Sequence, residues 1–207
     1  MVVVKFSSLT AISLSLLFCS GFALSSGKDL IGVLADFDRL RAEFTQQVYD
    51  EFGNALETSY GYLILRKPDI RWQTETPYKQ TALLSANKLK VFDPDLEQLV
   101  IKDLRSDTDQ IPLELLRRSE ASLEGFDISE ISKGAPRQVI FVLVPKSEEI
   151  LYSKITMETL ENKLRSISIY DLLGRRTKIE LSNITPLRAD DLVPIIEVPP
   201  GTDIVDG

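Results

Sequence analysis

Histidine is absent from the 207-residue chain, and the only cysteine, Cys19, lies in an N-terminal segment that we expect to be removed. Most catalytic triads take their base or nucleophile from these residue types, and zinc takes its nitrogen and sulfur ligands from them. Triads and zinc sites of those kinds are therefore excluded from the remaining chain. We expect no catalytic residue, no metal and no cofactor. A serine–lysine nucleophile stays possible, although no motif indicates one.

Carboxylates are frequent but are not spaced as metal ligands. The densest group, Asp93-Pro94-Asp95-x-Glu97, lacks the glycine and the oxygen-ligand spacing of a calcium-binding hand. The pairs Glu148-Glu149 and Asp190-Asp191 lie in loop-like contexts. We interpret all three groups as solvated turns.

The longest apolar run at the N-terminus, from about Leu9 to Cys19, is well short of the ~20 residues that a helix needs to cross a bilayer. It follows one basic residue, Lys5, and precedes the small residues Gly21 and Ala23, as in a secretory signal. Lipid attachment to Cys19 is the alternative, but it would need a small residue where Phe18 stands. We predict a signal peptide over residues 1–23.

Residues 24–207 are then expected to form a single domain without disulfides, stabilised by burial of apolar side chains. They carry 23 basic and 31 acidic residues, a net charge of −8. Nucleic acids and anionic membrane surfaces attract basic patches, so neither is expected as a standing partner. A partner with a basic face remains possible.

Short extended segments separated by turns fill the stretch from Tyr60 to Lys102. Each apolar or alternating run is too short for a helix, and Pro68, Pro77 and Pro94 fall between the runs, where a missing N–H costs no ladder bond. The pattern predicts a meander of five antiparallel strands.

The rest of the chain adds two short helices to a mainly β fold. Apolar residues at helical spacing predict a helix over Lys28–Phe37, and a proline followed by leucines and two arginines predicts another over 111–118. A further helical turn is expected over Ser119–Phe126. Alternation predicts the remaining strands, for a total of about eleven, antiparallel throughout; these strands are 40–48, 56–65, 127–132, 137–145, 152–158, 163–171 and 175–184. The helices can bury their apolar stripes only across the open face of this sheet.

The meander also carries residues that recur, in this order, in one protein family. They are Gly61-x-Leu63-x-x-Arg66-Lys67-Pro68, Arg71-Trp72, Pro77, Leu84-Ser85 and Phe92-Asp93-Pro94-x-x-Glu97-Gln98, with Phe44-Thr45-Gln46-Gln47, Ile111-Pro112-Leu113 and Pro199-Pro200-Gly201-Thr202 outside it. The chain resembles the periplasmic outer-membrane lipoprotein carriers of the LolA family over nearly all of its expected mature length. The order and spacing of the motifs carry this resemblance.

The resemblance implies an incomplete antiparallel β-barrel closed by a lid of short helices, with an apolar pocket for acyl chains. Ordinary core packing is the alternative role for each aliphatic residue of that pocket, whereas Trp72 is large and lies on a strand that is otherwise polar around it. Phe44 is added by strand alternation alone. The expected ligand-lining residues are Leu30, Leu34, Phe44, Ile70, Trp72, Leu83, Leu113 and Leu116.

Lys67 departs from the family pattern, in which an arginine commonly precedes the strand-bordering proline and holds the lid shut through hydrogen bonds to helix backbone. Lysine offers three donors on a flexible stem instead of a planar fork, so it can bind the same carbonyls but holds them less rigidly. We include Lys67 in the expected site; a solvated strand end is the alternative reading of Arg66-Lys67.

The leading hypothesis is a monomeric periplasmic carrier. By resemblance, it would take acylated lipoproteins from an inner-membrane ABC-type release complex and deliver them to an outer-membrane receptor. A carrier or sensor of another lipid is the nearest alternative. A lipid-acting hydrolase, with a carboxylate pair or serine in the pocket, is a third.

Overall fold

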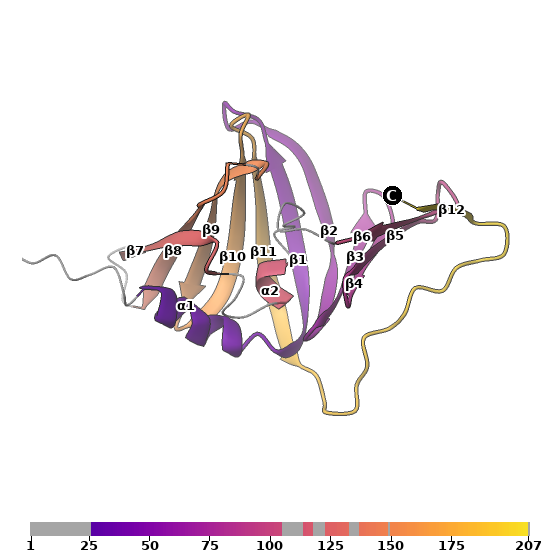
Figure 1. Ribbon diagram of the computed structural model, residues 1–207, viewed down its shortest axis with the longest axis horizontal. Helices are drawn as coiled ribbons and strands as arrows, with labels where there is room; N and C mark the ends of the chain where they lie inside the picture. The colour runs from indigo at the N-terminus through magenta and orange to yellow at the C-terminus, as the bar shows by residue number, and fades with distance from the viewer. Residues whose placement is uncertain (1–25, 105–113, 118–122, 133–136, 149, 207) are drawn as a thin grey trace, which may run out of the picture.

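The computed structural model describes residues 26–104, 114–117, 123–132, 137–148 and 150–206. Within these residues, two helices and twelve strands follow one another (Figure 1). They are α1 (Ser26–Ala35), β1 (Arg39–Tyr49), β2 (Ala55–Arg66), β3 (Asp69–Thr76), β4 (Gln80–Ser85), β5 (Lys88–Asp93), β6 (Gln98–Asp103), α2 (Glu114–Arg117), β7 (Phe126–Ser132), β8 (Gln138–Pro145), β9 (Tyr152–Leu160), β10 (Lys163–Asp171), β11 (Arg176–Pro186) and β12 (Asp203–Asp206).

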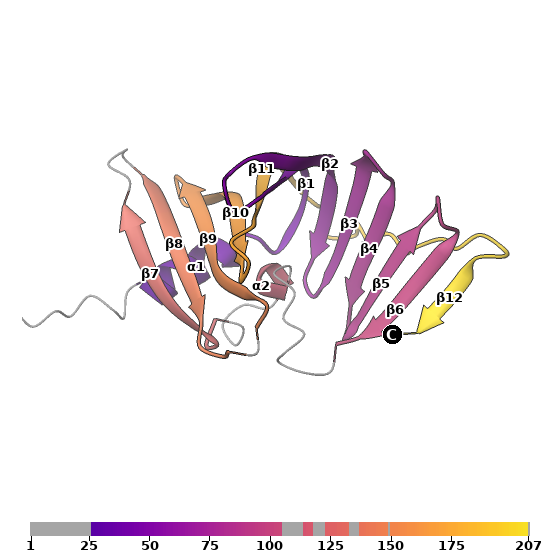
Figure 2. The ribbon, with the colours of Figure 1, turned by 90° about the horizontal axis from the view of Figure 1, so that it is seen from above.

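All twelve strands form one sheet in the order β12-β6-β5-β4-β3-β2-β1-β11-β10-β9-β8-β7. The sheet curves into an open half-barrel with both helices on its concave side (Figure 2). This confirms the expected incomplete barrel and the five-strand meander, which is β2 to β6. The prediction of an antiparallel sheet throughout is wrong at one edge, because β12 pairs with β6 in parallel.

Strand alternation builds the core on the concave face. Along β1 the even-numbered residues Leu40, Ala42 and Phe44 are buried, and their odd-numbered neighbours point outward. Leu63 and Leu65 of β2 continue this surface, and inward-facing side chains of β3, β4 and β8 to β11 complete it.

The helices lie close to their predicted positions, and α1 has the predicted length of ten residues but begins and ends two residues earlier. Helix α1 ends at Ala35, and Phe37 beyond it is buried and donates its N–H to the carbonyl oxygen of Leu34. Helix α2 has four residues. The prediction of a helical turn over Ser119–Phe126 is wrong for the described residues 123–126. Residues 123–125 form a non-helical turn, and Phe126 begins β7. Leu113 lies outside the described residues.

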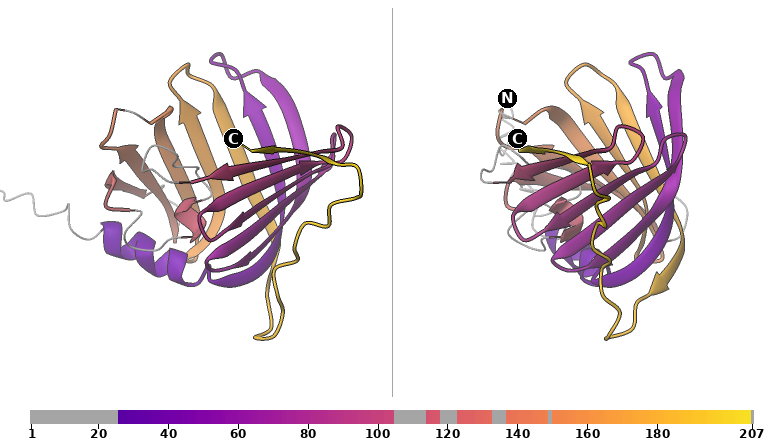
Figure 3. Two further views of the ribbon diagram at one scale, coloured as in Figure 1. Left: turned by 45° about the vertical axis from the view of Figure 1, so that its right-hand side comes forward. Right: turned by 90° about the vertical axis from the view of Figure 1, so that its right-hand side faces the viewer.

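Residues 187–202 cross the convex face as an extended strap that leads to β12 (Figure 3). Arg66 donates to the carbonyl oxygen of Asp191 at 2.9 Å, and Arg71 donates to those of Pro194 and Ile195 at 3.2 and 2.7 Å. Neither helix of the described chain has the length and apolar character needed to cross a membrane.

Candidate functional site: an apolar cavity beneath the lid helices

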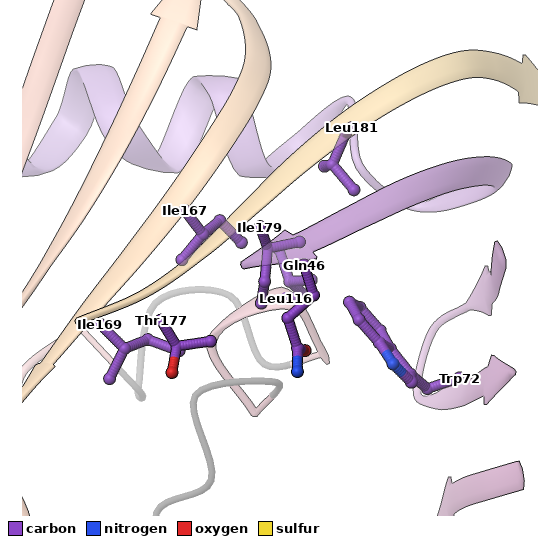
Figure 4. Close-up of a pocket in the computed structure, with 8 residues that line it drawn as sticks. All are labelled: Gln46, Trp72, Leu116, Ile167, Ile169, Thr177, Ile179 and Leu181. Carbon is purple, nitrogen blue, oxygen red and sulfur yellow. The ribbon is translucent and has the colours of Figure 1, made fainter. Parts of the chain in front are cut away.

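A cavity of about 170 Å³ lies between the concave face of the sheet and helix α2 (Figure 4). Trp72 stands on one side of it, and Ile169 and Thr177 stand on the other. Six of the eight lining side chains are apolar, so the cavity suits an aliphatic group. The lining residues are Gln46, Trp72, Leu116, Ile167, Ile169, Thr177, Ile179 and Leu181.

Strands β1, β10 and β11 supply most of this lining because their registers bring inward-facing residues side by side. Ile179 of β11 pairs with Gln46 of β1 and with Ile167 of β10. Ile169 pairs with Thr177 two residues further along the same two strands, and so on the same face of the sheet. These residues were not among the expected lining residues, although the alternation within the predicted strands 163–171 and 175–184 could have identified their inward faces.

The Trp72 ring lines the cavity next to the meander, and the Phe44 ring supports it from behind. The rings of Phe44 and Trp72 stack with centroids 3.9 Å apart and planes at 23°. They come from β1 and β3, with β2 between them, and the residue of β2 that pairs with Phe44 is Gly61. The absence of a side chain at Gly61 lets the two rings meet across the intervening strand.

Helix α2 forms the roof of the cavity. Leu115 and Leu116 are buried beneath it, and Arg117 at its end is only 4% exposed. The Arg117 guanidinium donates through Nη1 to the carbonyl oxygen of Ala86, in the hairpin between β4 and β5. A charge-assisted hydrogen bond therefore ties the roof to the meander.

Helix α1 is held by a second cation. The Lys67 ammonium, in the turn between β2 and β3, donates to the carbonyl oxygen of Leu34 at 2.7 Å. The backbone N–H of Lys67 also donates to the carbonyl oxygen of Asp38, at 3.0 Å. Lys67 thus caps the C-terminal turn of α1, where the helix dipole favours a positive charge. The contact with helix backbone that the resemblance implied is present, made by a single nitrogen.

Burial lowers the pKa of the Lys67 amine from its ordinary value of 10.5, and the Asp38 carboxylate opposes part of that shift. Unfolding therefore takes up a proton in the window just below pH 10.5, so the contribution of Lys67 to stability increases as the pH rises through that window. We expect wild-type stability, relative to that of a Lys67→Arg variant, to rise between neutral pH and pH 10.5. Urea denaturation of both proteins across that range measures the difference; a difference that falls with pH would contradict the prediction.

The expected lining residues separate into three groups. Trp72 and Leu116 line the cavity itself. Leu30, Leu34, Phe44 and Ile70 are buried in the core that surrounds it. Leu83 is placed elsewhere, and Leu113 is outside the described residues.

The expectation that Leu83 lies on the pocket floor is wrong. Leu83 pairs with Arg71 and Lys90, and it lies on the convex face beneath Ile195 of the strap. Its neighbours Ala82 and Leu84, which pair with Trp72 and Ile70, face the interior. Because Leu83 and Leu84 are both apolar, alternation could not show which of them faces the interior. A shift of one residue exchanges the two faces of a strand.

The cavity is smaller than the ~300–1,000 Å³ of typical ligand pockets, and close to the size of the apolar cavity of ~150 Å³ that accepts one benzene molecule. An acyl chain does not fit within this cavity unless α2 or the side chains beneath it move.

An open, curved and mainly antiparallel sheet with a helix over an apolar cavity defines a lidded half-barrel. Residues 35–191 match the family model described as "Outer membrane lipoprotein carrier protein LolA", and the chain belongs to this family. The outer-membrane lipoprotein carrier protein of Pseudomonas paraeruginosa is 31% identical over 179 residues, which cover 85% of each chain. That of Hahella chejuensis is 27% identical over 209 residues and covers 99% of this chain and 98% of its own.

Among solved structures, an uncharacterised conserved protein from Thermus thermophilus is similar in fold. The TM-score is 0.52 at 12% identity, covering 88% of this chain and 99% of that one.

Proposed function

We propose that this protein is a periplasmic chaperone that shields the acyl chains of lipoproteins. It would receive them from an inner-membrane ABC-type release complex and deliver them, as a monomer, to an outer-membrane receptor. The apolar cavity beneath α2 carries this proposal, and membership of a lipoprotein carrier family supports it.

Exposure of an acyl chain to water explains why such a carrier is needed. A chain of roughly a dozen methylenes costs about 10 kcal/mol in water, at ~0.8 kcal/mol per methylene. A carrier must offset this cost without exceeding it, because the cargo has to leave again. A cavity of about 170 Å³ that enlarges when the lid moves would meet both needs, since return of the lid favours release.

The two cationic contacts suit this opening. Lys67 holds α1 and Arg117 holds α2, each through backbone carbonyl groups. Each helix can separate from the sheet without breaking a strand ladder, provided that the cargo replaces the apolar contacts of the buried side chains, which include Leu34 and Leu116.

Adjacent residues of β4 provide a matched test of where the cargo lies. A photo-crosslinker at Leu84, which faces the interior, or at Trp72 is expected to yield adducts with triacylated proteins in periplasmic extracts. The same crosslinker at Leu83, on the convex face, is expected to yield none. Equal labelling from Leu83 and Leu84 would contradict the concave face as the cargo site, and adducts with free lipid alone would favour a carrier of another lipid.

Trp72 offers a second measurement, because it is the only tryptophan of the chain and lines the cavity. Titration of the purified protein with a synthetic triacylated peptide should change its fluorescence with saturation.

A further inference from the structure

Two hairpin loops of the sheet share one architecture. Loop 50–54 has the sequence Asp-Glu-Phe-Gly-Asn, and loop 171–175 has Asp-Leu-Leu-Gly-Arg. In each, one carboxylate oxygen of the aspartate accepts the backbone N–H groups of the third and fifth residues, at 3.0 and 2.8 Å in the first loop and 2.9 Å for both in the second. The glycine at the fourth position has φ of +86° or +84°, which only glycine adopts without strain.

These internal hydrogen bonds fix the loops, and the fixed loops hold large apolar side chains in solvent. Phe52 and Leu173, the third residues, are 81% and 72% exposed. The loops lie side by side at the upper end of the sheet in Figure 1, where a Cβ built on Gly174 would be 3.2 Å from Cβ of Glu51. Further exposed leucines come from the same end of the sheet, and together they form what we call the apolar rim: Phe52, Leu56, Leu151, Leu172 and Leu173.

A row of tyrosines and cations crosses four strands just beneath the loops. Lys154 of β9 pairs with Tyr170 of β10, Tyr170 pairs with Arg176 of β11, and Arg176 pairs with Tyr49 of β1. The Lys154 ammonium lies 4.4 Å from the Tyr170 ring centre, and the Arg176 guanidinium lies 4.2 Å from that of Tyr49. Tyrosine is enriched at membrane–water interfaces, and cations there meet lipid phosphates.

The rim and this row together resemble a surface that inserts into a bilayer. Apolar side chains lie outermost, and a layer of tyrosines and cations follows. The loop aspartates accept backbone N–H groups that would find no hydrogen-bond partner in lipid. The overall charge of −7 and the nearby Glu51 and Glu57 disfavour strongly anionic surfaces. We propose that the apolar rim inserts shallowly and reversibly into zwitterionic phospholipid bilayers, with the Lys154–Tyr170–Arg176–Tyr49 row at the headgroups.

The cavity lies next to the rim. Ile169 and Thr177, which line one end of it, are the pair adjacent to Tyr170 and Arg176. Insertion would therefore bring that end of the cavity to the membrane surface, where the proposed release complex and receptor would exchange cargo with the carrier. This purpose rests on the proposed function, whereas membrane binding itself does not.

Vesicle flotation tests the proposal. The purified protein is expected to float with vesicles of phosphatidylethanolamine and phosphatidylcholine, and a Phe52→Ser/Leu173→Ser double variant is expected to lose at least about tenfold in partitioning. The matched control is Leu192→Ser/Ile195→Ser on the strap, where the side chains are 75% and 74% exposed, and it should float like the wild type.

Either of two results would overturn the inference. The first is failure of the wild type to float, which would favour a protein partner for the rim. The second is flotation of the rim variant to the same extent as the wild type. Trp72 fluorescence with the triacylated peptide separates these outcomes from the proposed function. Failed flotation with normal titration rejects membrane insertion alone, and normal flotation with failed titration rejects the carrier role alone.

Discussion

A Gly61→Ala variant is expected to lose more than about 3 kcal/mol of stability, which is larger than the usual cost of overpacking a core. Alanine normally stabilises an extended segment relative to glycine. Here, however, the new Cβ would lie 1.9 Å from the carbonyl oxygen of Gln73 and 2.8 Å from Cζ of Phe44. The first of these atoms belongs to the backbone of β3, so the strand itself would have to shift.

The same clash would disturb the cavity wall, because a displaced Phe44 ring could no longer stack on Trp72. Urea denaturation and Trp72 fluorescence measure the two consequences. Gly32→Ala in α1 is the matched control, since nothing lies within 4 Å of its added Cβ. Because alanine has a higher helix propensity than glycine, Gly32→Ala should raise stability by up to about 1 kcal/mol. If Gly61→Ala were as stable as the wild type, the close approach of β2 and β3 at this point would be refuted.

A Leu116→Glu variant is expected to stay folded and to bind acylated cargo at least about tenfold more weakly, equivalent to ~1.4 kcal/mol. Leu116 is buried under α2 and lines the cavity. An unpaired buried carboxylate there costs several kcal/mol, so α2 should lift from the sheet to expose it to water. The strand ladders do not include α2 and should persist.

Titration of the triacylated peptide, with circular dichroism as the check on folding, measures this effect. Binding should recover partly at acid pH, because burial favours the neutral form of the introduced carboxyl group. Leu96→Glu, at a position 70% exposed in the hairpin between β5 and β6, should leave retention unchanged. Cargo binding by Leu116→Glu at wild-type affinity would mean that α2 is not part of the lid.

Local patterns predicted most of the fold. Alternation along β1 identified Phe44 as an inward residue, and the prolines at 68, 77 and 94 marked three of the turns of the meander. These features depend on neighbours in sequence, which is why they could be read without coordinates. The helical spacing of Leu30 and Leu34 predicted α1 for the same reason, and both residues are buried.

What the sequence could not supply depends on distant partners. Strand β12 forms because it pairs with β6, about a hundred residues earlier in the chain. Its own four residues are too few for alternation to predict a strand. The face on which Leu83 lies was ambiguous because Leu84 follows it. The contact of Arg117 with Ala86 required the hairpin and the helix to be placed together, whereas the sequence indicated only a favourable charge at a helix end.

The parallel pairing of β12 with β6 also affects how readily molecules can associate through the edge of the sheet. Without the chain's last segment, the six residues of β6 would end the sheet with unpaired N–H and C=O groups, a template on which another polypeptide could add as a further strand. The four exposed residues of β12 replace that template with a shorter one that begins and ends in aspartate, and like charges facing each other discourage stacking of molecules. We therefore expect β12 to protect this edge of the half-barrel from strand-by-strand association with other molecules.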